Sequence, residues 1–301
     1  MTAPAIEVHG LVKQYGDLVV VNGIDLVVEP GTFVGLLGPN GAGKTTTMEM
    51  IEGLRKPDSG TIEVLGMPVW PRNPKVLPRI GVQLQSSAFF ERLTAGEQLR
   101  AFADIYGMPA KRVDEMLELV GLTGKQKTRT EGLSGGQQQR LSLACALVHD
   151  PEVVFLDEPT AGLDPQARRN LWDVLQAIND RGHTVMLTTH FMDEAEVLCD
   201  EIAVMDNGKV LTSDRPRALI ASLGQAHRIL LDDHALPVEE AKSLPGVEAA
   251  VSDNGTLAIT THDTARVLAE LATLDALDGL QVSGATLEDV FLSLTGREFR
   301  A

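Results

Sequence analysis

The sequence predicts a large α/β domain followed by a small α+β domain, and three observations predict it. A glycine-rich loop lies between a strand-like run and a helix-like run. Two more apolar runs, residues 153–156 and 184–189, have the composition of parallel strands buried on both faces. After about Arg217, shorter strand and helix patterns replace these runs. A chain of 301 residues is long enough for two separate cores.

The glycine-rich loop spans residues 38–45 and fits the pattern G-x-x-x-x-G-K-[ST] at every fixed position. Strand-like residues 32–37 precede it, and residues 46–54 follow as a predicted helix with Met48, Ile51 and Leu54 facing inward. Glycines let the backbone turn its N–H groups toward phosphate oxygens, and the helix start adds partial positive charge. The predicted nucleotide contacts are Gly38, Pro39, Asn40, Gly41, Ala42, Gly43, Lys44, Thr45 and Thr46.

Ionic and metal chemistry is expected at the loop and after the next apolar run. Lys44 supplies a positive charge for the outer phosphates, and the Thr45 hydroxyl is placed to ligate Mg²⁺. Residues 153–156 end in Asp157 and Glu158, where the carboxyl edge of a parallel sheet meets ligand. We expect Asp157 to help hold Mg²⁺ and Glu158 to orient and deprotonate the attacking water. The alternative is that both carboxylates cap a turn.

The signature segment, residues 133–140 (LSGGQQQR), opens a predicted helix whose apolar residues recur at helical spacing. Its Gly135-Gly136 pair therefore lies at a helix N-terminus, which is a second anion-binding device. Two such devices beside one nucleotide loop suggest that each serves the nucleotide of a different molecule. An ordinary helix cap at Ser134 is the alternative.

With all three motifs present, residues 5–225 resemble the nucleotide-binding subunit of an ATP-binding-cassette (ABC) transporter. The resemblance implies an ATPase of the P-loop NTPase class that uses ATP and Mg²⁺. It implies a mixed sheet core with an antiparallel β subdomain and a helical subdomain at about residues 86–150, all within a domain spanning residues 1–216.

The resemblance also implies a pair of cassettes, either a homodimer or a heterodimer with a similar subunit. The signature of one cassette would close on the nucleotide of the other, through Ser134, Gly135, Gly136 and Gln137. In the family, the serine hydroxyl and the second glycine N–H contact the γ-phosphate.

Four single residues also match family motifs, in the same order along the chain as in the family. Tyr15 matches the aromatic residue that stacks on adenine, although a plain surface tyrosine is the alternative. Gln85 matches the glutamine that reports Mg²⁺ occupancy to the membrane subunit, with neighbouring Gln83 leaving the register open. Asp164 matches the carboxylate of the loop that crosses to the partner cassette. His190, after residues 184–189, matches the histidine that contacts the γ-phosphate.

Composition and charge indicate where the protein is located and which partners it binds. No apolar stretch reaches about 18 residues, and the N-terminal residues lack a secretory pattern. We therefore expect a cytoplasmic protein that is peripheral on the cytosolic face of the cell membrane and bound to a membrane-spanning permease subunit. The net charge of −16 disfavours a nucleic-acid partner. Cys145 and Cys199 are expected to be buried, reduced thiols.

Adjacent Phe89 and Phe90 lie in the predicted helical subdomain within an otherwise polar stretch. Adjacent phenylalanines usually belong to a core. The alternative is that at least one lines the groove that receives a cytosolic helix of the permease.

Residues 217–301 predict a small α+β domain, ferredoxin-like or similar. The order is strand 227–231, helix 238–244, strands 247–252 and 256–261 joined by an Asn-Gly turn, helix 264–274, and a last strand near 280–282.

The ending, residues 286–297, resembles the C-terminus of cassettes from daunorubicin-resistance, multidrug-type efflux pumps. This resemblance favours export of a drug, antibiotic or lipid-like substrate. Two alternatives stay open, an ABC importer ATPase and a non-transport soluble ABC ATPase acting on nucleic acid or translation.

Overall fold

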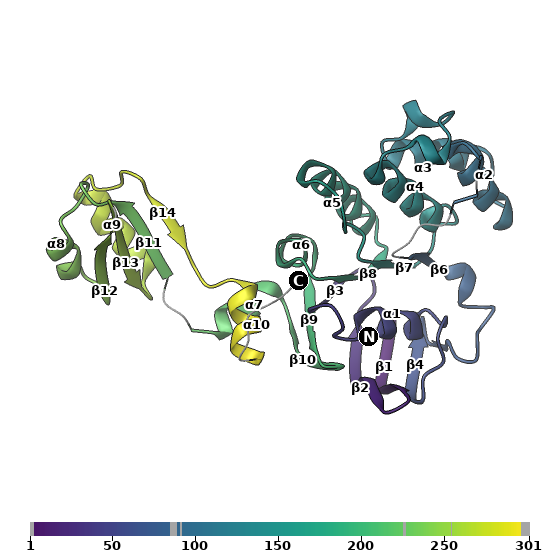
Figure 1. Ribbon diagram of the computed structural model, residues 1–301, viewed down its shortest axis with the longest axis horizontal. Coiled ribbons are helices and arrows are strands. Elements are labelled where there is room, and N and C mark those ends of the chain that lie inside the picture. Colours follow the sequence, from purple (N-terminus) through teal and green to yellow (C-terminus); the bar gives the residue numbers. More distant parts are fainter. Residues whose placement is uncertain (1–2, 85–88, 91, 225–226, 254, 296–301) are drawn as a thin grey trace. The chain divides into compact units, whose positions relative to one another are not determined.

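The computed structural model describes residues 3–84, 89–90, 92–224, 227–253 and 255–295 (Figure 1). The chain divides into two compact units, one ending at Pro216 and one beginning at Arg217. No helix in these described ranges combines the length and apolarity needed to cross a membrane.

An antiparallel sheet forms the first layer of the first unit, in the order β2-β1-β4-β5. β1 and β2 are joined by a tight hairpin in which Tyr15 pairs with Leu18 and Gly16 adopts a φ of 58°. Glycine is favoured there because a side chain at positive φ is strained. The strands are β1 (Ile6–Tyr15), β2 (Leu18–Val28), β4 (Ser59–Val64) and β5 (Met67–Pro68).

A second sheet of the first unit carries the parallel strands, in the order β10-β9-β3-β8-β7-β6. All neighbours from β9 to β6 pair in parallel, and β10 pairs antiparallel with β9. β3, β7 and β8 are buried at every position, as predicted from their apolar runs. The bounds are β3 (Phe33–Leu37), β6 (Ile80–Gln83), β7 (Val153–Asp157), β8 (Thr184–Thr189), β9 (Glu201–Asp206) and β10 (Lys209–Asp214).

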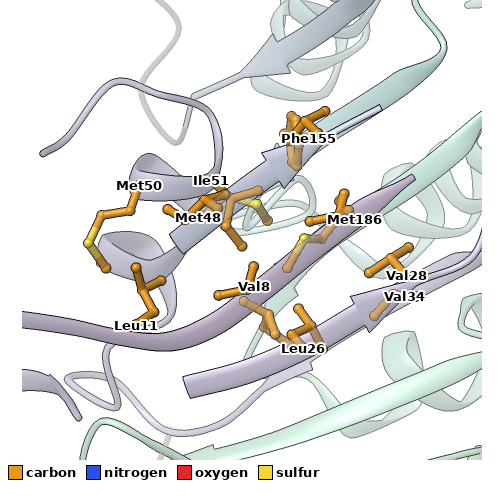
Figure 2. Close-up of a cluster of buried hydrophobic side chains, with 14 of the residues drawn as sticks. Val8, Leu11, Leu26, Val28, Val34, Met48, Met50, Ile51, Phe155 and Met186 are labelled. Atoms are coloured by element: carbon orange, nitrogen blue, oxygen red, sulfur yellow. The ribbon is translucent and has the colours of Figure 1, made fainter. Parts of the chain in front are cut away.

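Helix α1 (Lys44–Ile51) joins the hydrophobic core that both sheets share. Figure 2 shows Met48 and Ile51 of this helix among side chains from both sheets. The prediction that the helix continues to an inward Leu54 is wrong, because Leu54 is 48% exposed. Glu52 is the C-cap, and Gly53 follows at a φ of 73°, a left-handed conformation that ends helices.

Three helices gather beside β6 in Figure 1 and pack on one another. They are α2 (Ala95–Ile105), α3 (Lys111–Leu119) and α4 (Gly135–Leu147), with short 3-10 turns at Leu77–Arg79, Thr123–Lys125 and Thr130–Gly132. Two more helices, α5 (Pro165–Asn179) and α6 (Met192–Leu198), contact each other, and α6 packs on β3 and β8. Cys145 and Cys199 are buried free thiols, as predicted, and burial raises both thiol pKa values, that of Cys145 to about 12.

The second unit holds an antiparallel sheet in the order β12-β13-β11-β14. The chain runs β11 (His227–Asp232), α8 (Val238–Ser243), β12 (Ala249–Asp253), β13 (Thr256–Thr261), α9 (Thr264–Thr273) and β14 (Gln281–Ser283), a β-α-β-β-α-β succession. Helices α7 (Pro216–Ser222) and α10 (Leu287–Thr295) flank it in the sequence. Its core is an apolar cluster that includes Ile229, Leu231 and Leu257.

Candidate functional site

The phosphate loop joins the buried end of β3 to the start of α1, and two of its glycines are required by close backbone contacts. A Cβ on Gly38 would lie 2.3 Å from the Met205 carbonyl oxygen, and one on Gly43 would lie 2.6 Å from the Val20 carbonyl oxygen. Gly43 is also the α1 N-cap at a φ of 99°. Only glycine fits at these points, because a Cβ would overlap a neighbouring carbonyl, so the two glycines let the loop pack closely between β3 and α1.

The Lys44 ammonium is buried at the centre of the site. Its side chain is 4% exposed, and Nζ donates to the carbonyl oxygens of Gly38 (2.8 Å) and Pro39 (3.1 Å). Nζ also lies 3.7 Å from Oε1 of Glu158. Burial lowers the pKa of Lys44, and the nearby carboxylates of Glu158 and Asp157 oppose that shift. A partly desolvated cation held in this way interacts strongly with any anion that reaches it.

Thr45 and Asp157, the two described residues predicted to hold Mg²⁺, meet in the structure. The Thr45 hydroxyl donates to Oδ1 of Asp157 at 3.2 Å, although 112 positions separate them. The Thr188 hydroxyl donates to the same oxygen. Burial raises the pKa of Asp157, and these two hydrogen bonds act against the rise.

Glu158 lies between Lys44 and His190. Its Oε1 is 3.2 Å from Nδ1 of His190 and 3.7 Å from Nζ of Lys44. The backbone of Glu158 has a φ of 46°, an uncommon conformation for a residue with a side chain. Its N–H donates to the hydroxyl (3.0 Å) and the carbonyl oxygen (3.2 Å) of Thr188, which hold the strained turn in place.

Thr188 was not singled out from the sequence, yet it contacts both carboxylate residues. It lies near the end of β8, directly beside Asp157 of β7 in the parallel register. The sequence feature that indicates its role is a hydroxyl residue directly after three apolar residues of a strand, and the structure buries that position fully. Buried hydroxyls need partners, so a threonine at the carboxyl end of a core strand is a candidate for positioning a site.

These residues fit a bound MgATP. A carboxylate and a hydroxyl are oxygen ligands of the kind Mg²⁺ prefers, and Mg²⁺ usually takes one or two protein ligands together with substrate phosphates. The buried Lys44 cation and the Thr45–Asp157 oxygen pair match that requirement.

The signature segment starts α4 as predicted, and it lies in different surroundings from the phosphate loop. Ser134 is the N-cap and forms a reciprocal capping box with Gln137. α4 packs against α2, α3, α5 and β6, whereas α1 packs against β1, β2, β4, β7 and β8. A Cβ on Gly135 would meet nothing within 4 Å, so its backbone is open to an approaching group.

Asp164 has a local role that the sequence did not reveal. Its Oδ1 accepts hydrogen bonds from the N–H groups of Gln166 (3.0 Å) and Ala167 (2.9 Å), which makes it the N-cap of α5. A Cβ on Gly136 would lie 3.2 Å from Cβ of Ala167, so the first turn of α5 and the signature segment are neighbours within one chain.

Tyr15 and Gln85 are the remaining predicted nucleotide contacts. The Tyr15 side chain is on the surface, where its hydroxyl accepts a hydrogen bond from Arg55. The centre of its ring lies 5.5 Å from Cζ of Arg55 and 5.4 Å from Nζ of Lys13. Its role in adenine stacking stays a prediction. Gln85 lies outside the described residues.

A cavity of about 440 Å³ opens next to the helical region, between the end of α1, β6, α2 and α4. Phe89 lines it, together with apolar residues such as Leu77, Leu84 and Phe102. Phe90 is 57% exposed, and its N–H donates to Oε1 of Gln98 at 3.0 Å. Neither phenylalanine is fully buried, which argues against a core role for the pair, and contact with a permease helix stays a prediction.

Comparisons with known proteins agree with this geometry. A family model described as ABC transporter matches residues 21–161. The Nod factor export ATP-binding protein I of Ralstonia nicotianae is 39% identical over 308 residues, covering 99% of this chain and 96% of that protein. The protein of the same name from Paraburkholderia xenovorans is 43% identical over 308 residues, covering 100% of both.

Solved structures give the same result over about three quarters of the chain. One is cbiO1 from Clostridium perfringens, described as part of the ABC transporter complex cbiONQ, with a TM-score of 0.67 and 30% identity. The match covers 73% of this chain and 92% of that one. Another is described as the ATP binding subunit of an ABC transporter, with a TM-score of 0.66, 28% identity and coverage of 73% and 93%.

Proposed function

The chain belongs to the ATP-binding subunits of ABC transporters, and we propose that it powers export of a drug, antibiotic or lipid-like substrate through a separate membrane permease. As a member of this family it is an ATPase. Export is supported by the relatives named for Nod factor export, which align with nearly the whole chain. The substrate class is supported by the likeness of residues 286–297 to daunorubicin-type efflux cassettes.

The observation that carries the proposed chemistry is the series of contacts from Lys44 through Glu158 to His190. The loop N–H groups and Lys44 hold the outer phosphates of ATP. Thr45 and Asp157 hold Mg²⁺, which supplies neutralising charge when bound. Glu158 orients the attacking water and takes its proton, and His190 lies close enough to orient that carboxylate. Phosphoryl transfer asks mainly for positioning and charge neutralisation, so an ordinary carboxylate suffices as the base.

We propose that two copies of the chain, or this chain and a similar cassette, complete each nucleotide site. Ser134 and Gly136 of one copy would contact the γ-phosphate held by Lys44 of the other. This proposal is supported by the open backbone at Gly135 and by the separate packing of α1 and α4 within one chain. ATP drives closure only to the extent that it binds the closed pair better than the open one.

Light scattering tests the pairing. Glu158→Gln, incubated with Mg²⁺ and ATP, should double in mass because it binds ATP without turning it over, and adding Ser134→Arg should prevent this. A strictly monomeric Glu158→Gln subunit, even with its permease supplied, would overturn the paired site.

Transport in inverted membrane vesicles tests direction and substrate class. Vesicles that contain the native complex should accumulate daunorubicin when ATP is added outside, and vesicles with Glu158→Gln should not. Accumulation only in right-side-out vesicles would indicate an importer. Recovery of the subunit with ribosomes or DNA at physiological salt, without any membrane protein, would indicate the soluble alternative.

A further inference from the structure

Glu194 is a buried acidic residue to which the proposed chemistry gives no part. It lies in the first turn of α6, and the whole residue is 0% exposed. Burial raises the pKa of its carboxyl group, and the nearby hydroxyls of Thr189 and Thr160 and the Trp172 N–H oppose that rise. A carboxylate in a protein interior costs free energy unless polar groups compensate it, so the groups around Glu194 indicate its role.

The polar groups around Glu194 come from three separate segments of the first unit. Trp172 of α5 donates its indole N–H to Oε1 of Glu194 at 3.1 Å. Thr189 is the last residue of β8, directly before His190. Thr160 lies in the turn after β7. The Glu194 carboxylate therefore lies where α5, the end of β8 and the turn after β7 come together.

A second side chain of α5 contacts the residues on either side of the α6 start. Arg168 lies four positions before Trp172, and its Cζ is 3.9 Å from the ring centre of Phe191, the residue after His190. Such cation–π contacts are attractive. Nη1 of Arg168 also lies 3.5 Å from Oδ2 of Asp193. Two side chains on one face of α5 therefore hold the first turn of α6.

The segment from Thr189 to Phe191 is fixed from several sides. The Thr189 carbonyl oxygen accepts a hydrogen bond from the Gly38 N–H of the phosphate loop (3.3 Å), and its hydroxyl accepts one from the Phe191 N–H (2.9 Å). The rings of Phe191 and His190 lie 4.1 Å apart, centre to centre. The His190 imidazole is thereby directed at Glu158, with Nδ1 3.2 Å from Oε1.

We propose that Glu194 is a positioning residue for ATP hydrolysis: its bond with Trp172 holds α6 against α5, so that His190 keeps its contact with Glu158. The inference rests on the proposed function, in which His190 orients the Glu158 carboxylate. Among the described residues, one carboxylate oxygen of Glu194 has no hydrogen-bond partner and the other is bonded to Trp172. Losing that bond lets the first turn of α6 shift, which lengthens the contact between His190 and Glu158.

Steady-state kinetics of the full-length subunit test the bond. Trp172→Phe keeps an aromatic ring but removes the N–H, so kcat should fall about fivefold, as for one lost hydrogen bond. KM for ATP should change less than about twofold, because the phosphate loop is intact. A kcat within about 1.5-fold of wild type would overturn the proposal.

Gln176→Met is the matched control. Gln176 also joins α5 to α6, because its Nε2 donates to the Val197 carbonyl oxygen at 3.4 Å, but it lies one turn further along α5 than Trp172. Its loss should leave kcat and KM unchanged. An equal fall of kcat in Gln176→Met would mean that any loosening of the two helices has this effect, and it would overturn a specific role of Glu194.

A His190→Ala background separates positioning from a general loss of stability. The residue to be positioned is absent there, so adding Trp172→Phe should change single-turnover hydrolysis less than about 1.5-fold. The same fivefold loss in both backgrounds would make the bond merely structural and overturn the proposal. Glu194→Ala should behave as Trp172→Phe does in both backgrounds. If Glu194→Ala does not fold, Trp172→Phe decides the question alone.

NMR of the subunit labelled with ¹³C-histidine reports the position of the ring. The Cε1 signal of His190, assigned by its absence in His190→Ala, should shift in Trp172→Phe and stay in place in Gln176→Met. An unchanged signal in Trp172→Phe contradicts the proposal.

The outcomes separate this inference from the proposed function. A wild-type rate in Trp172→Phe, together with a slow His190→Ala, overturns the inference and leaves the proposed chemistry standing. A wild-type rate in His190→Ala removes His190 from the proposed chemistry and overturns the inference with it.

Discussion

The two compact units of this protein differ in what they bury. In the first unit, charged residues are buried together with several threonines and glutamines, and the charged ones include Lys44, Glu52, Asp157, Glu158 and Glu194. In the second, Thr261 is the single buried polar residue within the described ranges, and the core cluster is entirely aliphatic. Buried charges lower stability unless they are paired. The first unit therefore holds groups that folding alone would not favour, which locates the chemistry there and leaves packing as the visible role of the second unit's interior.

Removing the proposed base, Glu158, should give the largest effect, and it tests whether the chemistry lies in the first unit. Glu158→Gln should lower the ATPase rate by about 10² to 10⁴-fold, the usual range for a general base, with little change in ATP affinity. Single-turnover hydrolysis and nucleotide titration measure the two quantities. Glu152→Gln, which removes a surface partner of Arg79, is the control. A rate within a few-fold of wild type would exclude Glu158 from the mechanism.

Truncating a core side chain in the second unit tests whether the interior of that unit serves packing alone. Leu231→Ala removes a buried side chain of β11 and should destabilise that unit by about 2 to 5 kcal/mol. Native-state proteolysis with mass spectrometry should detect the loss after Arg217. ATP hydrolysis by the intact chain should stay within about twofold. Val251→Ala, at a site 61% exposed, should change neither. If hydrolysis fell in parallel with stability, the separation of roles drawn above would be wrong.

The buried Glu52 predicts a pH dependence that belongs to the first unit alone. Its pKa is about 8 in the folded subunit, against 4.5 for an ordinary glutamate, so the folded state keeps a proton that the unfolded state releases. This contribution to stability is complete below about pH 4.5 and is lost as pH rises toward 8. Relative to Glu52→Gln, the unfolding free energy of wild type should fall by up to about 1.4 kcal/mol per pH unit.

Urea unfolding of the isolated subunit between pH 5 and pH 7.5 measures that difference. The charged and titratable groups around Glu52, namely Asp157, Glu49, Arg72 and His149, are the same in both proteins. Glu29→Gln, at an exposed position, should follow the wild-type curve. Parallel curves for wild type and Glu52→Gln would mean that Glu52 is not protonated in the folded subunit.

The smallest effect is expected at Thr188, which separates positioning from binding within the site. Thr188→Val keeps the shape of the strand residue but removes the hydroxyl that contacts Asp157 and the Glu158 N–H. The ATPase rate should fall about tenfold, because losing a hydrogen bond near a charge raises the activation free energy by about 1.4 kcal/mol. The affinity for ATP should change less than about threefold. Thr184→Val, which alters the other end of β8 and its bond from Gly31, is the matched control. Equal losses in both variants would reduce Thr188 to a structural residue.

The short motifs of this protein were predictable from its sequence. The phosphate loop, the helix start at Ser134 and the carboxylates at the end of β7 all depend on residues within a few positions of one another. The capping box between Ser134 and Gln137 shows why, because its hydrogen bonds join groups three residues apart. The helical spacing of Leu54 predicts a longer α1 than the structure has, because Gly53 follows the C-cap in a left-handed conformation that ends the helix.

Only the tertiary structure decided which of these groups meet. Glu158 reaches Lys44 because β3, β8 and β7 are adjacent in the parallel sheet, an order that no short motif encodes. The same packing gives Thr188 its two partners and buries the Glu52 carboxylate without a hydrogen-bond partner among the described residues. The physical reason is range: backbone dihedrals and caps act within about four residues, whereas burial and charge pairing depend on segments more than a hundred residues apart and on how the whole core packs.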